Sequence, residues 1–228
     1  MEIKSFTNYY GDLIKPYGFD LLKVPAKGAR FAQFINNKSE VIFEHSIHFI
    51  SWGDLDFNLS ANNEIITEIY NSLEGVVPTD ELYLLSTNLR TYITPGNYDG
   101  FCNRATVTNN QYDFKRIKSE KETEEFAKTI YREIFSKSVP SIIEQTNSIK
   151  KIDSLLNLNP PVLDAEGDPK MRVHSRSLPA QLLVALLLAK TLNREDYNEL
   201  LKIYSGFVNK FSPGEVSNID VIKKNFFT

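Results

Sequence analysis

The segment from Val41 to Ser60, VIFEHSIHFISWGDLDFNLS, contains two strand-like runs joined at Trp52 and Gly53. In the second run, the apolar residues Leu55, Phe57 and Leu59 alternate with the polar residues Asp54, Asp56, Asn58 and Ser60. Alternate side chains of a strand lie on the same face, so this pattern predicts one apolar and one polar face. The first run is apolar at both parities, which is typical of a central strand covered on both sides.

The residues before this segment predict a helix followed by an antiparallel meander. Helical spacing of Phe6, Tyr10 and Ile14 predicts a helix over residues 4–15, and Gly18 suits its end. Strands are expected over residues 19–24, 30–35, 41–50 and 55–60, with a turn at residues 36–38.

The middle of the chain predicts further short elements. Asn62 or Asn63 is expected to cap a helix whose apolar stripe is Ile65, Ile69 and Leu73. Strands are then expected over residues 82–93, 105–108 and 112–117.

The second half of the chain has a helical pattern. Ser119 and Glu122 have the spacing of a capping box. Pro140 is expected to kink or end that helix, and its position suits the start of a new one. Ser177 is expected to cap an apolar helix, and Asn193 to break it and cap the next.

These elements predict an α+β fold with a mostly antiparallel sheet of about five strands, helices on one face and a helical C-terminal extension. The expected domains are an α+β domain over residues 1–158, a proline-containing linker over 159–177 and helices over 178–228.

Composition and charge narrow the function classes. Hydrophobic residues make up 42% of the 228 residues, which is enough for a sizeable core, and the formal net charge is −3. A weakly acidic chain is a poor general binder of nucleic acid, because phosphate binding needs a basic surface. A small basic cluster at Lys115, Arg116, Lys118 and Lys121 is followed at once by acidic residues that oppose it.

Cysteine content and hydropathy indicate the cellular compartment of the protein. The single cysteine, Cys102, allows no intrachain disulfide, which fits the reducing cytoplasm. The N-terminus lacks the pattern of a signal peptide. The longest apolar run, residues 182–189, is far shorter than the ~20 residues that span a bilayer. We therefore expect a cytoplasmic protein.

Candidate catalytic and metal-binding residues are few. His45 and His48 are three apart in a strand, so they lie on opposite faces and do not share a metal. Cys102 has no neighbouring group that would activate its thiol. Phosphate-binding glycine loops are absent, and we expect no cofactor and no metal.

The polar row beside Trp52 is the best candidate site. Asp54 and Asp56 share a face and could act as an acid–base pair, whereas Trp52 is a residue type favoured at protein interfaces. We expect Trp52, Asp54, Asp56 and Asn58 to contact a partner protein.

Three features together resemble a known bacterial family: a first helix that ends in YGFDLL, a strand-rich middle, and the segment SEKETEEFAKTIYREIFSKSVPSIIEQTNSIKKIDSLL. The family is called domain of unknown function 4304, and the resemblance covers about residues 1–158. Members are associated with toxin–immunity gene neighbourhoods. The resemblance implies a non-enzymatic, protein-binding bacterial domain and transfers no residue role.

Three functions therefore stay open at this point. The first is a protein-binding domain, for example an immunity protein that neutralises a toxin. The second is a hydrolase that uses Asp54, Asp56 and a distant histidine. The third is a homodimer formed through the apolar C-terminal helices. The absence of catalytic motifs favours the first function.

Overall fold

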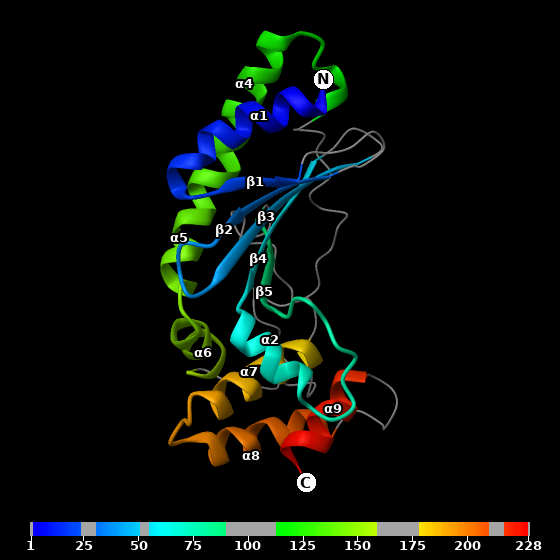
Figure 1. Cartoon of the computed structure of the whole chain (residues 1–228), viewed down its shortest axis with the longest axis vertical. Coiled ribbons are helices and arrows are strands. Elements are labelled where there is room, and N and C mark those ends of the chain that lie inside the picture. The colour runs from blue at the N-terminus through cyan, green and yellow to red at the C-terminus, as the bar shows by residue number, and fades with distance from the viewer. Residues whose placement is uncertain are drawn as a thin grey trace, which may run out of the picture. The chain divides into compact units, whose positions relative to one another are not determined.

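The computed structural model of the chain consists of one antiparallel sheet and several helices, so the predicted α+β class is confirmed (Figure 1). The structure describes residues 2–23, 31–50, 55–89, 113–158, 178–209 and 217–227. The sheet has five strands in the order β1-β2-β3-β4-β5, which is also their order along the chain. The strands are β1 (Asp20–Lys23), β2 (Phe31–Asn36), β3 (Ile42–Phe49), β4 (Leu55–Asn62) and β5 (Tyr83–Asn88).

Helices precede, interrupt and follow the sheet. They are α1 (Ile3–Ile14), η1 (Lys15–Tyr17), α2 (Glu64–Asn71), η3 (Phe114–Arg116), α4 (Glu120–Ile130), η4 (Tyr131–Phe135), α5 (Ser136–Thr146), α6 (Ile149–Asn157), α7 (Leu178–Thr191), α8 (Tyr197–Val208) and α9 (Ser217–Phe226).

By its internal contacts the chain divides into two compact units. Unit 1 comprises residues 1–60 and 87–145, and unit 2 comprises residues 61–86 and 146–228. Residues 61–86 and 146–158, which the sequence pattern grouped with the first domain, thus belong to unit 2. The predicted linker over residues 159–177 lies outside the described residues.

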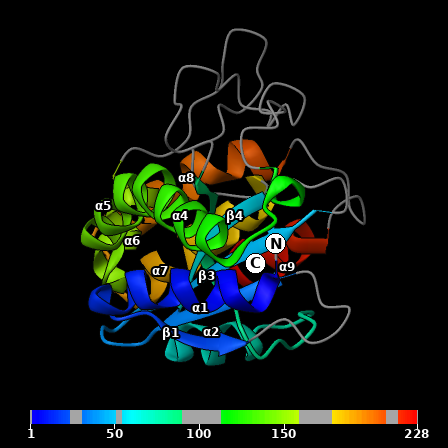
Figure 2. The same cartoon turned by 90° about the horizontal axis from the view of Figure 1, so that it is seen from above.

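In unit 1, helix α1 forms where the apolar spacing predicted it. Phe6, Tyr10 and Ile14 are fully buried along one side of the helix. Gly18 follows η1 with φ 88°, a left-handed conformation that glycine adopts without a Cβ clash. α1 lies beside α4, as both views of the fold show (Figures 1 and 2).

The alternation along the strands gives the sheet two different faces. β3 is the middle strand, as predicted, but the expected apolar cover on both sides is wrong, because Ser46 and His48 are partly exposed on one face. The register pairs Phe34 with His45 and Ala32 with Ile47, and all four side chains are fully buried. Phe6 of α1 meets Phe49 of β3 edge to face, with ring centroids 5.8 Å apart. This core face carries most of the aromatic packing of unit 1.

The helix that Ser119 caps continues past Pro140, so Pro140 neither ends it nor starts a new helix. Ser119 and Glu122 form the predicted capping box. Directly before α5, the π-helix η4 has wider turns, and the Ser136 N–H donates to the Tyr131 carbonyl. We attribute the uninterrupted helix to this wider segment, which absorbs the register change that a proline without an N–H imposes. The next helix, α6, begins instead at Ser148, whose side chain caps it.

Unit 2 is built around α7, in which every side chain from Gln181 to Ala189 is buried. α6, α8, α9 and α2 all contact α7. An apolar helix without a polar face needs cover on all sides, and these helices provide it. The sequence pattern did not distinguish α9 as an element of its own.

The turn between α7 and α8 differs in detail from the prediction. Asn193 ends the first helix with φ 50°, as expected of a helix-breaking asparagine. The cap position of α8 is Asp196 rather than Asn193, and its carboxylate makes no capping hydrogen bond. Both oxygens of Asp196 instead accept from Arg194, at 2.7 Å each.

Two further local predictions are wrong. In α2, Asn63 caps the helix, but Ile66 is the fully buried residue and Ile65 is 61% exposed. Adjacent isoleucines fit two helical stripes equally well, so the pattern could not choose between them. Residues 114–116 form a 3₁₀ turn rather than a strand, because the Asp113 side chain accepts the Lys115 N–H.

Candidate binding face

The second face of the sheet in unit 1 carries a set of polar side chains. They come from β2, β3, β4 and β5, and we call them the polar face: Gln33, Glu44, Ser46, His48, Asp56, Asn58 and Asn88. Glu44 is buried, and the others are partly exposed. The period of two along each strand places these residues opposite the aromatic core.

Asp56 is the centre of the polar face. Its Oδ2 accepts from the Asn58 side-chain amide at 3.3 Å along the same strand. Its Oδ1 accepts from the Asn88 side-chain amide across to β5. Two carboxamides on two strands therefore fix the orientation of one carboxylate. Hydrogen bonds to a charged acceptor are stronger than neutral ones, so this arrangement is well defined.

The neighbouring strands continue the row with further polar pairs. Gln33 Nε2 donates to Glu44 Oε2 at 2.7 Å between β2 and β3. Ser46 and His48 are in hydrogen-bond contact at 3.2 Å. The His48 ring stacks on Phe31 with centroids 5.7 Å apart. These contacts restrict the side chains, which lowers the entropy that binding would cost.

His45 lies behind this row, on the core face, as the predicted opposite placement of His45 and His48 requires. Its Nδ1 donates to the Asn58 carbonyl at 3.0 Å, because a carbonyl only accepts. Its Nε2 then accepts from the Tyr10 hydroxyl at 2.8 Å. Burial lowers the pKa of His45 to about 4, and the bond to Asn58 opposes this only in part. Burial also raises the pKa of Tyr10 well above its usual value.

The structure brings together half of the predicted site. Asp56 and Asn58 lie side by side, as the alternation predicted. Trp52 and Asp54 fall outside the described residues. Sequence reasoning missed Asn88 and the pair of Gln33 and Glu44 as parts of this face. The parity shared by Ser86 and Asn88 was visible, but the strand register that sets Asn88 against Asp56 was not.

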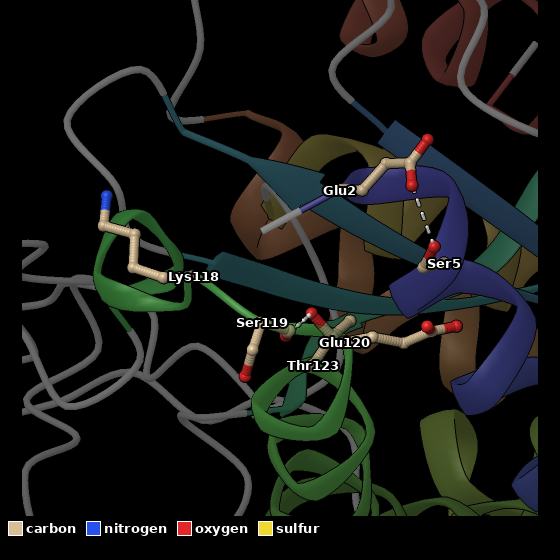
Figure 3. A pocket seen from close by; sticks show the side chains of 6 residues that line it. All are labelled: Glu2, Ser5, Lys118, Ser119, Glu120 and Thr123. Atoms are coloured by element: carbon tan, nitrogen blue, oxygen red, sulfur yellow. Dashed lines mark hydrogen bonds between the residues drawn. The ribbon is translucent and has the colours of Figure 1, made fainter.

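A shallow depression at the start of α1 and α4 is a second candidate site (Figure 3). Its volume is about 260 Å³, and it is lined by Glu2, Ser5, Lys118, Ser119, Glu120 and Thr123. The positive ends of two helices meet there, which would suit an anion.

Carboxylates already occupy this position. Glu122 accepts the backbone N–H groups of Lys118 and Ser119, and these bonds lower the pKa of Glu122. Glu120 accepts the Tyr9 hydroxyl at 3.0 Å, which raises the pKa of Tyr9. The depression therefore lacks the net positive character that an anion site needs.

Two other properties bear on function. Within the ranges that the structure describes, no three His, Cys, Asp or Glu side chains converge to hold a metal ion. Among the same residues, no helix has the length and apolar character needed to cross a membrane. Cys102 and His174 lie outside these ranges.

Comparisons of the chain with protein-family models, curated proteins and solved structures found no significant match. The resemblance to domain of unknown function 4304 therefore stays a prediction. A function must be argued from the geometry of the chain itself.

Proposed function

We propose that the protein is a non-enzymatic binding protein that recognises another protein through the polar face of unit 1. The observation that carries the proposal is the hydrogen-bonded group of Asp56, Asn58 and Asn88, which joins two strands. A set of partly exposed polar side chains, hydrogen-bonded to one another across strands, suits a protein surface better than a small molecule.

A hydrolase based on Asp54 and Asp56 has less support. Such a site needs a histidine within reach of the carboxylates. His45 is fully buried on the opposite face with both ring nitrogens engaged, and His48, which does lie on the polar face, stacks on Phe31 and hydrogen-bonds to Ser46. Both carboxylate oxygens of Asp56 accept hydrogen bonds from amides. These contacts favour a structural and binding role for Asp56.

The structure removes the reason for expecting a homodimer through the C-terminal helices. The apolar run of α7 was the reason to expect a subunit interface. Leu182 to Ala189 are each at most 4% exposed, so this run is already covered within one chain. The partner that we propose is therefore a different protein.

The resemblance to a toxin–immunity-associated family supports a narrower version of the proposal, in which that partner is a toxin. An immunity protein neutralises a toxin by occupying its surface. The acidic balance of the chain, with a net charge of −3, is suited to a basic partner.

The test is affinity capture from the native cells with three proteins in parallel. They are the wild type, the double variant Asp56→Ala/Asn58→Ala, and a matched control, Asn8→Ala/Asp12→Ala. Asn8 and Asp12 are exposed on α1 of the same unit, so the control removes the same residue types from another surface.

We expect one stoichiometric protein to co-purify with the wild type and the control and to be lost with the Asp56/Asn58 variant. Circular dichroism of all three proteins should confirm an unchanged fold. A partner retained by a folded Asp56/Asn58 variant would show that the polar face is not the binding site.

A further inference from the structure

We propose that Asp56 is the acceptor for a cationic anchor, the guanidinium group of an arginine presented by the partner protein. This inference rests on the proposed function, because it names the chemistry that the polar face recognises. It assigns Asn58 and Asn88 the role of positioning residues that hold the Asp56 carboxylate.

The first argument is the missing counter-charge of Asp56. Several carboxylates of the described chain are paired with cations: Asp113 with Arg116, Glu124 and Glu125 with Lys128, Asp153 with Arg194, and Glu74 with Lys224. Among the described residues, Asp56 contacts two amides and no lysine or arginine. A partly exposed carboxylate without a cation can accept hydrogen bonds from the cation of a partner.

The second argument is the direction of the hydrogen bonds around Asp56. The Asn58 and Asn88 side-chain nitrogens both donate to the carboxylate. Each carboxylate oxygen has two lone pairs, so each keeps acceptor capacity for a further donor. The Asn58 side-chain oxygen is one more acceptor beside them. Asp56 and the Asn58 side-chain oxygen can therefore accept hydrogen bonds from several N–H donors. They have no donor directed outward that would bind an anion.

The third argument is the charge of the surrounding face. Glu44 adds a second carboxylate. No lysine or arginine stands among the described side chains on this face of β2 to β5. A guanidinium is planar, carries five N–H donors and binds a carboxylate through two parallel bonds, whereas an ammonium is a point charge. A carboxylate whose orientation is fixed by two amides suits the planar group better.

The test is a titration of the whole chain, followed by nuclear magnetic resonance, with two matched small probes. The first probe is N-acetyl-arginine methylamide. The second is N-acetyl-citrulline methylamide, which has nearly the same shape but no charge. The signals to follow are the Asp56 carboxylate carbon and the side-chain amides of Asn58 and Asn88. The titration is repeated with Asp56→Asn and with Asp12→Asn, which removes an exposed carboxylate from α1.

We expect the arginine probe to shift these three signals and the citrulline probe to leave them unchanged. Asp56→Asn should weaken binding of the arginine probe about tenfold, the loss expected for a hydrogen bond to a charged group. Asp12→Asn should bind like the wild type.

Equal responses to both probes, no response at these signals, or an unchanged affinity of Asp56→Asn would each overturn the inference. Those results would leave the proposed function standing, because a protein partner could still be lost from the Asp56→Ala/Asn58→Ala variant in the capture experiment. If capture is unaffected by that variant while the arginine probe still binds at Asp56, the proposed function fails and the cation site remains.

Discussion

Unit 1 and unit 2 bury polar side chains in two different ways. In unit 1 the fully buried His45 is neutral, and the rings of Tyr10, Phe34 and Phe135 surround it. In unit 2 a charged pair, Asp153 and Arg194, is held at 2.7 Å beside an otherwise aliphatic helix. The core of unit 1 around His45 is thus satisfied without charge, whereas the interior of unit 2 includes a matched ion pair.

The pair in unit 2 belongs to a larger network. Asn157 donates to Asp153 at 2.7 Å and to the Ala185 carbonyl of α7 at 2.9 Å. Tyr204 of α8 donates to Asn157 at 2.6 Å. Hydrogen bonds to Asp196 and Asp153 raise the pKa of Arg194 above its usual value. The network therefore joins α6, α7 and α8, and each member depends on the others.

This difference predicts which perturbation will lower the stability of each unit. A neutral histidine in a core responds to pH, because its protonation charges the interior. An ion pair with a buried carboxylate responds to the removal of that carboxylate, because the hydrogen bonds that it accepts are then lost. These two responses can be tested separately, from the largest expected effect to the smallest.

Removal of Asp153 should have the largest effect. Asp153→Ala removes the buried carboxylate that accepts from both Arg194 and Asn157, and the loss of these two hydrogen bonds should cost unit 2 about 3 kcal/mol of stability. The measurement is hydrogen exchange of the α7 amides. Asp196→Ala is the control, because the Asp196 side chain is 42% exposed and exposed ion pairs contribute at most about 1 kcal/mol. Equal losses in the two variants would contradict the distinction.

Acid should act on unit 1 through His45. Its folded pKa of about 4 lies below the ordinary 6.5, so the unfolded chain binds the proton more readily. Stability is then complete above pH 6.5 and decreases as the pH falls toward 4. Between pH 7 and pH 5 this group should cost unit 1 about 2 kcal/mol. Hydrogen exchange of β3 measures the loss, and His45→Gln should remove this part of the pH dependence. A pH dependence identical in both proteins would show that His45 is not its source.

Loss of the Tyr10 hydroxyl tests the same pair at constant pH. Tyr10→Phe keeps the ring and leaves the His45 Nε2 without a donor, which should destabilise unit 1 by about 1.5 kcal/mol. Tyr17→Phe is the matched control, since Tyr17 is 41% exposed and its hydroxyl bonds to Tyr131 near solvent. Urea unfolding, monitored with several probes, should show a larger loss of stability for Tyr10→Phe than for Tyr17→Phe. Equal losses would refute a stabilising role of the buried bond between Tyr10 and His45.

Helix caps provide the smallest comparison between the units. In unit 1, Ser119 belongs to a reciprocal capping box, whereas in unit 2, Ser148 accepts one hydrogen bond, from the Lys151 N–H. We expect Ser119→Ala to cost about 1 kcal/mol and Ser148→Ala about half of that. Amide hydrogen exchange in the first turns of α4 and α6 measures the loss of stability in each variant. The reverse order would show that the reciprocal bond adds nothing.

Local patterns predicted much of the sheet and the helix ends. The strands near Val41–Ser60, the glycine at position 18 and the Ser119 capping box are determined by residues close in sequence. Short-range spacing carries this information, because strand alternation and capping depend on neighbours a few residues apart.

Features that depend on distant contacts were not predictable in this way. The pairing of Asn88 with Asp56 and of Tyr10 with His45 joins residues 32 and 35 positions apart. Pro140 inside a helix depends on the π segment before it. The burial of Ile66 rather than Ile65 depends on what α2 packs against. In each case the local pattern was compatible with more than one structure, and tertiary packing determined which of them forms.

The central claim is that the polar face of unit 1 binds a protein partner. The most direct measurement is the dissociation constant of the captured partner for the wild type, Asp56→Ala/Asn58→Ala and Asn8→Ala/Asp12→Ala, by calorimetry. We predict that the first variant weakens binding at least about a hundredfold, the effect of losing an interface hot spot, and that the second binds like the wild type. Equal dissociation constants for all three proteins would contradict the account.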